Sequence, residues 1–212
     1  MLFLFCFPKC RSTLNRNGPQ VLLQQQIRSI IIEHSHIAME KENDTKDIYF
    51  AGGCFWGTEH YFKQIDGVLA TEAGFANGFT PDPTYKEVYT DTTGYAETVH
   101  VTYDPKTISL DFLLEMFFKA IDPTSVNRQG EDRGTRYRTG VYYVDPEDEP
   151  TIKEAFDREQ KHISGKLAVE NLPLKNFYKA EDYHQDYLEK NPGGYCHLPK
   201  SLFEFARHAK MK

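Results

Sequence analysis

From residue 47 onward, the hydrophobic and polar positions follow two periods that predict alternating strands and helices. Strands are predicted over residues 47–51, 68–75, 96–103, 139–144 and 167–172, and apolar and polar residues alternate well over residues 96–103. In the run AETVHVTY this alternation places Glu97 on the same face as Val99 and Val101. A carboxyl group therefore shares a face with apolar side chains at the start of the third predicted strand.

Apolar residues at helical spacing predict helices over residues 54–64, 110–121, 150–163 and 180–190. Ser109 can cap the second of these helices. Residues 76–95 and 124–138 are rich in Gly, Pro, Asn, Asp and Thr and are predicted to be long loops, and the chain after residue 190 is predicted to be irregular. Because strands and helices interleave, the sequence predicts one α+β domain over residues 44–212, with a mixed sheet and helices packed on it.

Residues 1–43 differ from the rest and are predicted to be a separate N-terminal extension. Residues 1–32 contain four basic residues and no Asp or Glu, which is typical of a transit peptide. The apolar opening MLFLFCF lacks a basic region before it, so a secretory signal is a weaker interpretation. Met39 begins a hydrophilic run, so residues 1–38 can also be an upstream start. In each case the extension is expected to be disordered or loosely attached.

Composition and charge narrow the classes of function. The chain has 212 residues, of which 40% are hydrophobic and 26% charged, as in ordinary globular proteins. A formal net charge of -6 argues against a general nucleic-acid binder, which carries a basic face. No apolar run reaches the roughly 18 residues that span a bilayer. We therefore expect no nucleic-acid partner and no membrane segment.

The chain has four cysteines, Cys6, Cys10, Cys54 and Cys196, which are too few for a disulfide framework in a domain of this size. Cys54 follows two glycines and precedes a predicted helix. Unpaired N–H groups at a helix start favour an anion, so this thiol is expected to ionise more easily than a free cysteine, whose pKa is about 8.5. The same position also suits a small buried residue. The pattern alone leaves both interpretations open.

The run GGCFWGTEHYF around Cys54 resembles the active-site signature of the A-type peptide methionine sulfoxide reductases. Further segments resemble this family in the same order: PTYKEVYTDTTGYAETVHVTYDP (83–105), DPTSVNRQGEDRGTRYRTGVYY (122–143) and KAEDYHQDYLEKNPGGYC (179–196). Together the matches cover nearly all of residues 47–196 and contain rare words such as GCFWG and NRQG. The resemblance is therefore highly specific.

The resemblance implies a ferredoxin-like two-layer core and reduction of the S epimer of methionine sulfoxide, free or in proteins. It implies that Cys54 attacks the sulfur and that Glu97 is the acid toward the sulfoxide oxygen. Tyr85 and Tyr137 match the tyrosines that hydrogen-bond this oxygen. The physical chemistry agrees, because a carboxyl group in a partly dry site keeps its proton near neutral pH and a neutral phenol donates without adding charge.

Other matched residues are implied to shape the binding site. Phe55 and Trp56 match the rings that receive the S-methyl group, and an apolar cage suits a methyl group. Asp132 matches an aspartate that shapes the same site. His184 and Glu181 match positions near the pocket and are expected to have supporting roles.

Cys196 is implied to resolve the sulfenic acid left on Cys54, forming a disulfide that thioredoxin reduces. Gly193 and Gly194 give its loop flexibility. We expect no cofactor and no metal, methionine sulfoxide in oxidised proteins or free as the substrate, and a monomer. The location is expected to be cytoplasmic, with organelle targeting or export by residues 1–38 left open.

Departures from the family pattern leave the outer pocket and the peptide preference open. Tyr95 stands where the family often has His, Arg136 where Gln is common, and Thr139 where Ser is common. The segment GFANG (74–78) replaces the more usual GYxGG.

Two rival functions remain to be weighed. A thiol peroxidase would form the same sulfenic acid but needs Arg or hydroxyl donors for a peroxide in place of a methyl cage. A metal or redox-sensing module would use Cys54, His184, Cys196 and His197. Zinc ligands usually occur as spaced pairs, and the adjacent Cys196 and His197 are poorly placed for one ion.

Overall fold

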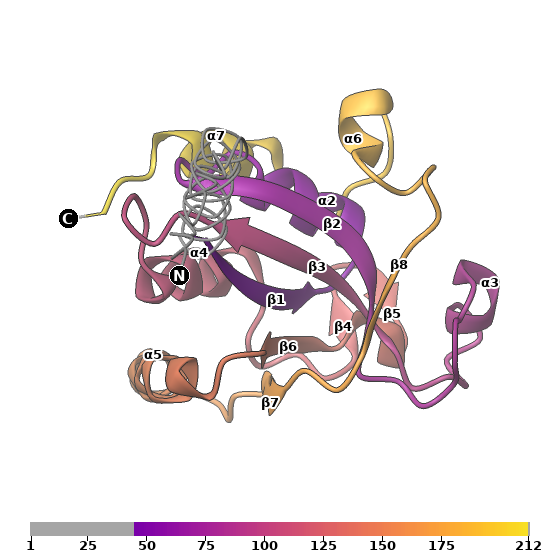
Figure 1. The fold of residues 1–212 in the computed structure, drawn as a ribbon, viewed down its shortest axis with the longest axis horizontal. Helices are drawn as coiled ribbons and strands as arrows, with labels where there is room; N and C mark the ends of the chain where they lie inside the picture. The colour runs from indigo at the N-terminus through magenta and orange to yellow at the C-terminus, as the bar shows by residue number, and fades with distance from the viewer. Residues whose placement is uncertain (1–44, 212) are drawn as a thin grey trace, which may run out of the picture. The chain divides into compact units, whose positions relative to one another are not determined.

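Six strands form one mixed sheet in the computed structural model, which describes residues 45–211 (Figure 1). They are β1 (Lys46–Gly52), β2 (Val68–Ala76), β3 (Ala96–Tyr103), β6 (Thr139–Tyr143), β7 (Glu170–Pro173) and β8 (Phe177–Lys179). Their order across the sheet is β7-β6-β1-β3-β2-β8. Neighbouring strands are antiparallel except β6 and β7, which run parallel. The mixed α+β fold predicted from the sequence is confirmed.

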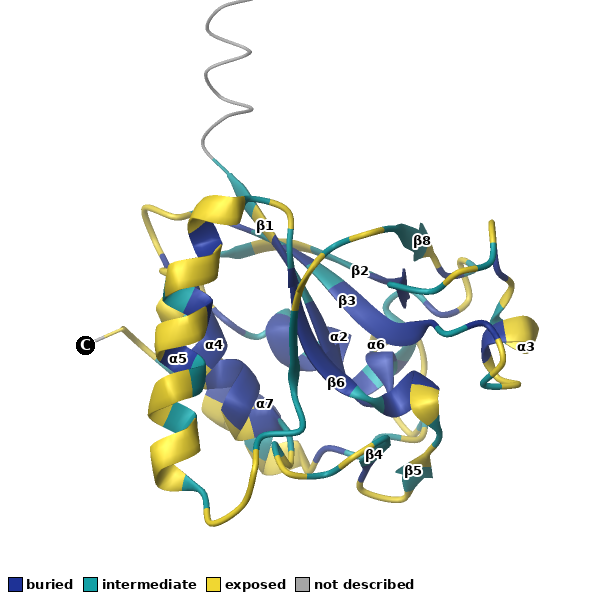
Figure 2. Cartoon of the chain, turned by 90° about the horizontal axis from the view of Figure 1, so that it is seen from below, coloured by how far each residue is buried: buried dark blue, intermediate teal, exposed yellow. Residues whose placement is uncertain are grey.

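The longer helices of the described chain are α2 (Phe55–Phe62), α4 (Leu110–Ala120), α5 (Glu149–His162) and α7 (Lys200–His208). Ser109 caps α4 as expected, because its hydroxyl accepts the N–H of Phe112 at 3.2 Å. Figure 2 shows that α5 is exposed along its outer side, and it buries only Ile152 and Ala155. This helix therefore covers α4 and does not reach the centre of the sheet.

The larger core lies on the sheet face that α2 and α4 cover. Phe50 of β1 stacks on Phe62 of α2, with ring centroids 4.5 Å apart, and on Phe117 of α4, at 5.0 Å. Val99 of β3 belongs to the same cluster. Strand alternation places Glu97 on this face too, two residues earlier. The opposite face carries a smaller cluster, formed by Ala51, Ala76, Ala96 and Tyr142.

Both segments predicted to be long loops contain short elements, so that part of the prediction was incomplete. Residues 76–95 include α3 (Tyr85–Val88), which begins with a capping box between Thr84 and Glu87. Residues 124–138 include the hairpin of β4 (Arg128–Gln129) and β5 (Asp132–Arg133), followed by the 3-10 helix η1 (Thr135–Tyr137). A second 3-10 helix, η2 (Pro146–Asp148), precedes α5.

The C-terminal part differs most from the prediction. The helix predicted over residues 180–190 is reduced to α6 (Tyr187–Lys190), and β8 was not predicted. The prediction of irregular structure after residue 190 was wrong, because α7 forms there. This helix buries Phe203, whose ring lies edge-on to His60 of α2 at 4.7 Å. An amphipathic helix of this length depends on such a partner surface.

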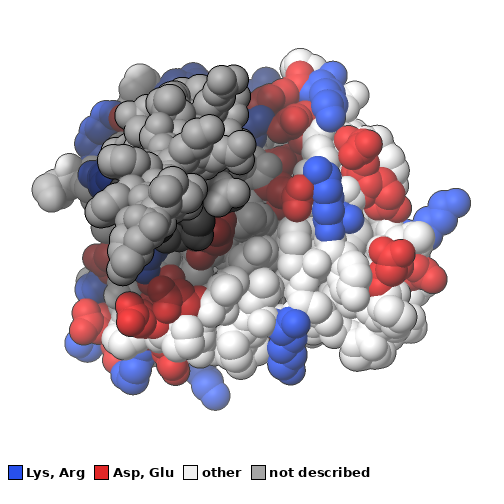
Figure 3. Space-filling view, in the orientation of Figure 1, with Lys and Arg blue, Asp and Glu red and all other residues white. Residues whose placement is uncertain are grey.

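The N-terminal extension predicted over residues 1–43, with Cys6 and Cys10, lies outside the described residues. Within residues 45–211, no helix is both long and apolar enough to cross a membrane. On the face drawn in Figure 3, outside the grey atoms, Lys and Arg side chains alternate with Asp and Glu side chains. Charge on this face is therefore balanced locally.

We expect Phe117→Ala to lower the free energy of unfolding by about 3–5 kcal/mol, because it removes a fully buried ring from the main core. Chemical denaturation would measure the loss. Phe205→Ala is the matched control, since this ring on α7 is 43% exposed and its removal should cost less than about 1 kcal/mol. Equal losses in the two variants would contradict this placement of the core.

Candidate active site

Cys54 lies where β1 turns into α2, as the sequence predicted, and it is the N-cap residue of that helix. The residue is only 5% exposed. Gly53 makes the turn with a φ of +86°, and a Cβ atom there would lie 2.6 Å from the Cβ of Gln129. Glycine alone tolerates both conditions. The turn therefore holds the thiol inside the protein, at the positive end of a helix.

The pKa of the Cys54 thiol is raised well above its ordinary value, so the expectation of an easily ionised thiol was wrong. Burial is the main cause, and the negative charge of Glu97 adds to it. The backbone N–H of Trp56 opposes the change by hydrogen-bonding the sulfur. Desolvation thus outweighs the helix terminus. In this reduced structure the sulfur is a protonated thiol at neutral pH.

Glu97 is 1% exposed at the start of β3, beside the first turn of α2. Its Oε2 atom accepts the backbone N–H of Phe55 at 3.1 Å. Its Oε1 atom is buried without a hydrogen-bond partner among the described residues. Burial raises the pKa of this carboxyl to about 8, although the N–H of Phe55 and the charge of Arg136 both lower it. Glu97 therefore holds a proton at neutral pH and has an oxygen free to bond.

Tyr85 on α3 and Tyr137 in η1 come from the two loop regions and lie near Cys54 and Glu97. Burial raises the pKa of both phenols, and the negative charges of Glu97 and Cys54 raise it further. Such an influence requires proximity. Both side chains therefore stay neutral and can donate a hydrogen bond beside the thiol and the carboxyl group.

Arg136 links the loops that carry these two tyrosines. Its guanidinium lies 2.7 Å from Oδ2 of Asp91, and its backbone N–H donates to Oδ1 of Asp91 at 3.0 Å. The guanidinium carbon also lies 4.1 Å from the ring centre of Tyr89 and 4.4 Å from that of Tyr137. A planar guanidinium can form an ion pair and stack on rings at the same time. This departure from the family pattern thus fixes η1 against the loop that follows α3.

An aromatic wall lies beside the thiol. The ring of Phe55 is 5.0 Å from His184 and 6.3 Å from Tyr85, measured between centroids. Trp56 stacks on Tyr187 at 3.7 Å with an interplanar angle of 13°. These contacts fix both rings that the sequence assigned to an apolar cage.

His184 and Glu181 connect this wall to α3. The indole Nε1–H of Trp56 donates to Nδ1 of His184 at 3.0 Å. Burial lowers the pKa of His184 to about 4, so the ring is neutral and its proton is on Nε2, 3.9 Å from Oε2 of Glu181. Oε1 of Glu181 accepts the backbone N–H of Tyr85 at 3.1 Å. His184 therefore positions the indole of Trp56, and Glu181 positions the start of α3 at Tyr85.

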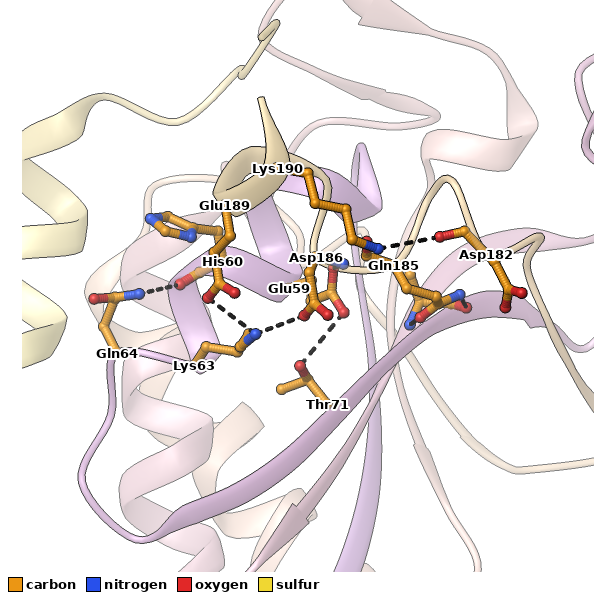
Figure 4. A network of polar contacts seen from close by, with 11 residues as sticks. Glu59, His60, Lys63, Gln64, Thr71, Asp182, Gln185, Asp186, Glu189 and Lys190 are labelled. Carbon is orange, nitrogen blue, oxygen red and sulfur yellow. Dashed lines mark hydrogen bonds and ion pairs between the residues drawn. The ribbon is translucent and has the colours of Figure 1, made fainter. Parts of the chain in front are cut away.

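A partly buried polar network holds the segment that carries His184 against α2 and β2 (Figure 4). Glu59 of α2 accepts the backbone N–H of Asp186 at 2.9 Å and the hydroxyl of Thr71 at 3.4 Å. Lys63, one turn further along the helix, lies 2.5 Å from Asp186. Burial raises the pKa of Glu59 to about 7. The helix that begins at the thiol thus also anchors the far side of the aromatic wall.

The β4–β5 hairpin brings Asp132 to the same end of α2. Gln129 is 2% exposed and exchanges two 2.8 Å hydrogen bonds with the backbone of Asp122, which closes this loop. Oδ1 of Asp132 accepts the hydroxyl of Tyr195 at 2.9 Å, and Oδ2 lies 3.9 Å from Nδ1 of His197. Asp132 therefore connects the hairpin to the loop that carries Cys196.

Cys196 lies beside the first turn of α2. A Cβ atom on Gly57 would be 2.9 Å from Sγ of Cys196, so only glycine leaves room for this sulfur. The backbone N–H of Leu198 donates to Sγ at 3.4 Å. A negative charge on Cys196 is among the causes that raise the pKa of Cys54, so the two sulfurs are near one another. Both are free thiols in this structure.

The residues that the sequence assigned to the site converge on the N-terminal end of α2: Cys54, Phe55, Trp56, Tyr85, Glu97, Asp132, Tyr137, Glu181, His184 and Cys196. Over residues 45–211, no group of three or more His, Cys, Asp or Glu side chains is arranged to hold a metal ion.

A model of the peptide methionine sulfoxide reductase family matches residues 46–211. The chain belongs to this family. It is therefore an oxidoreductase that reduces methionine sulfoxide. The reductase is 58% identical over 159 residues to the peptide methionine sulfoxide reductase MsrA of Clostridium acetobutylicum, a match that spans 75% of this chain and 98% of that protein.

Solved structures with a similar fold are also methionine sulfoxide reductases or their relatives by sequence. Mxr1 from Saccharomyces cerevisiae in its reduced form is 39% identical, with a TM-score of 0.71, over 74% of this chain and 92% of that one. Mxr1 in complex with Trx2 is 28% identical, with a TM-score of 0.50, over 68% of this chain and 86% of that one. The fold is thus shared with a yeast protein whose structure is known in a reduced form and in a complex with Trx2.

Sequence reasoning missed several polar residues that hold the site together. Gln129 and Glu59 were not singled out, although Glu59 falls on the apolar side of α2, at helical spacing from Phe55 and Phe62. That spacing was a usable signal. The ion pair between Arg136 and Asp91 could not be predicted from the sequence around Arg136, because Asp91 belongs to another loop.

We expect Arg136→Gln to raise the pKa of Glu97 above its value of about 8, because the guanidinium charge lowers it. The carboxyl would then stay protonated to higher pH. Infrared difference spectra over a pH titration would measure this, with the signal assigned by its absence in Glu97→Gln. Arg136→Lys keeps the charge and should leave the titration close to that of the wild type. An unchanged or lower pKa in Arg136→Gln would contradict the assigned influence.

Proposed function

We propose that this protein reduces the S epimer of methionine sulfoxide, free or in oxidised proteins, with Cys54 as the nucleophile and Glu97 as the acid. The observation that carries the proposal is the buried carboxyl of Glu97, with a pKa of about 8, hydrogen-bonded to the helix terminus that bears Cys54. A sulfoxide oxygen is a poor leaving group until it is protonated. A neutral carboxyl next to the attacking sulfur supplies that proton.

The reductive step transfers one oxygen atom from the substrate to the enzyme. The sulfur of Cys54 attacks the sulfoxide sulfur as the proton of Glu97 passes to the oxygen, and the thiol proton of Cys54 returns to the carboxylate. A sulfur–sulfur bond forms as the sulfur–oxygen bond of the substrate breaks. The departing hydroxide then attacks the sulfur of Cys54, the sulfur–sulfur bond breaks, methionine is released, and Cys54 becomes a sulfenic acid. This proton exchange lets Cys54 react although its pKa is raised. The thiol gives up its proton only when Glu97 has lost its own and can accept one.

Two features support a preference for one epimer. Tyr85 and Tyr137 are neutral donors near Cys54 and Glu97, so they can bind the sulfoxide oxygen on that side. Phe55 and Trp56 form the apolar wall suited to the S-methyl group. When oxygen and methyl positions are both fixed, only one configuration at sulfur directs the remaining substituent outward.

We further propose that Cys196 resolves the sulfenic acid and that thioredoxin reduces the resulting disulfide. Cys196 lies beside the first turn of α2, near Cys54, and is partly exposed. It also lines an open groove with Leu198 and Phe203, which gives a protein partner access to it. The complex of Mxr1 with Trx2, a thioredoxin, supports this partner. Residues 44–212 are then the reductase domain, and residues 1–43 an extension to it.

The decisive experiment supplies separated S and R epimers of a methionine sulfoxide with thioredoxin as the reductant. We expect turnover of the S epimer, at most trace turnover of the R epimer, and loss of activity to background in Cys54→Ser. Hydroperoxide serves as the comparison substrate. Equal use of both epimers, or preferred turnover of hydroperoxide, would contradict the proposal.

Cys196→Ser is expected to release about one equivalent of methionine per enzyme and then stop when thioredoxin is the reductant, because the sulfenic acid has no partner thiol. Quantifying methionine in a single-turnover and a steady-state assay would separate the two phases. Dithiothreitol can attack the sulfenic acid directly and should restore cycling. Normal cycling of this variant with thioredoxin would rule out the resolving role.

A further inference from the structure

A buried histidine next to Cys196 has no part in the chemistry described so far. The side chain of His197 is 3% exposed, and its Nε2 lies 3.2 Å from the carbonyl oxygen of Gly52. A carbonyl oxygen only accepts, so Nε2 carries the hydrogen and Nδ1 presents a lone pair. Nδ1 is buried without a hydrogen-bond partner among the described residues. A buried acceptor without a partner is uncommon in folded proteins.

Nδ1 of His197 and the sulfur of Cys196 lie close to the same point. The position that a Cβ atom on Gly57 would occupy is 3.3 Å from Nδ1 and 2.9 Å from Sγ. Both atoms therefore border one small volume beside the first turn of α2, the helix whose N-cap residue is Cys54. The adjacency that made Cys196 and His197 poor ligands for one ion does not hinder a proton transfer between them.

The groups around this pair determine which of them holds the proton. Burial raises the pKa of the Cys196 thiol and lowers the pKa of His197. Asp132 is the charged group that faces the imidazole from the hairpin, with Oδ2 at 3.9 Å, and it opposes the lowering only in part. The arrangement is therefore a protonated thiol beside a neutral imidazole. A thiol reacts slowly unless it is ionised, so resolution requires a base.

We propose that His197 is the general base of the resolving step, a role that rests on the proposed function of Cys54 and Cys196. The proton of the Cys196 thiol passes to Nδ1 as its sulfur attacks the sulfur of the Cys54 sulfenic acid. The sulfur–oxygen bond breaks, and the departing hydroxide takes the proton from Nδ1 and leaves as water. One disulfide and one water form, and the imidazole ends neutral. The oxidising equivalent comes from the sulfenic acid itself.

The test follows the two steps separately in the full-length protein, with methyl sulfoxide substrate and no thioredoxin. Rapid-quench measurement of methionine reports the reductive step, and loss of dimedone-reactive sulfenic acid reports resolution. In His197→Gln the amide can still donate to Gly52 but cannot take a proton. We expect methionine release at the wild-type rate and resolution slowed about a hundredfold near neutral pH. The defect should shrink as pH rises, because Cys196 then ionises without help.

The matched control is His60→Gln. His60 lies on α2, and like His197 it has a buried Nδ1 without a partner among the described residues and a pKa lowered by burial. It should leave both steps unchanged. His197→Ala provides a second variant, in which added imidazole should restore resolution.

Each other outcome has a distinct meaning. A resolution rate that is unchanged in His197→Gln overturns the proposal. So does a defect of equal size at every pH that imidazole fails to relieve in His197→Ala, since that pattern indicates packing alone. A wild-type protein that releases no methionine from the substrate would instead overturn the proposed function, independently of His197.

Discussion

The hydrogen bond from the backbone N–H of Phe55 to the carboxyl of Glu97 is the contact on which the site depends. It joins the start of β3 to the first turn of α2, so it places an acid next to the helix terminus that carries Cys54. The carboxyl is also cut off from water, and desolvation raises its pKa more than the hydrogen bond lowers it. The buried position of Glu97 thus determines both where its carboxyl group lies and that this group is protonated.

Four side chains around that contact are neutral at neutral pH. Glu97 is neutral at neutral pH, Tyr85 and Tyr137 are neutral phenols, and His184 is a neutral imidazole. A neutral surrounding with many donors suits a substrate that is polar but uncharged, whereas an array of cations would favour an anion. Cys54 is not a free thiolate, because the hydrogen bond from the backbone N–H of Trp56 does not offset its loss of hydration.

The site residues come both from the regular elements of the fold and from its loops. Sheet and helix supply the nucleophile and the acid, while loops supply the phenols, the hairpin aspartate and the second cysteine. Polar contacts hold these loops. Arg136 joins one loop to another through Asp91, Gln129 closes its own loop through Asp122, and Glu59 of α2 accepts the backbone N–H of Asp186. Loop residues held in this way can be placed as accurately as those of a helix. These contacts fix the loop residues in their positions within the site.

The sequence by itself determined the alternation of strands and helices, the position of Cys54 at a strand–helix turn, and the face of Glu97, because each follows from local periodicity. The family motifs named the remaining site residues. Only the tertiary structure decided that the pKa of Cys54 is raised, that α7 forms against α2, and that His197 lies beside Cys196. Desolvation and packing depend on what distant segments place around a group, and no local pattern records that.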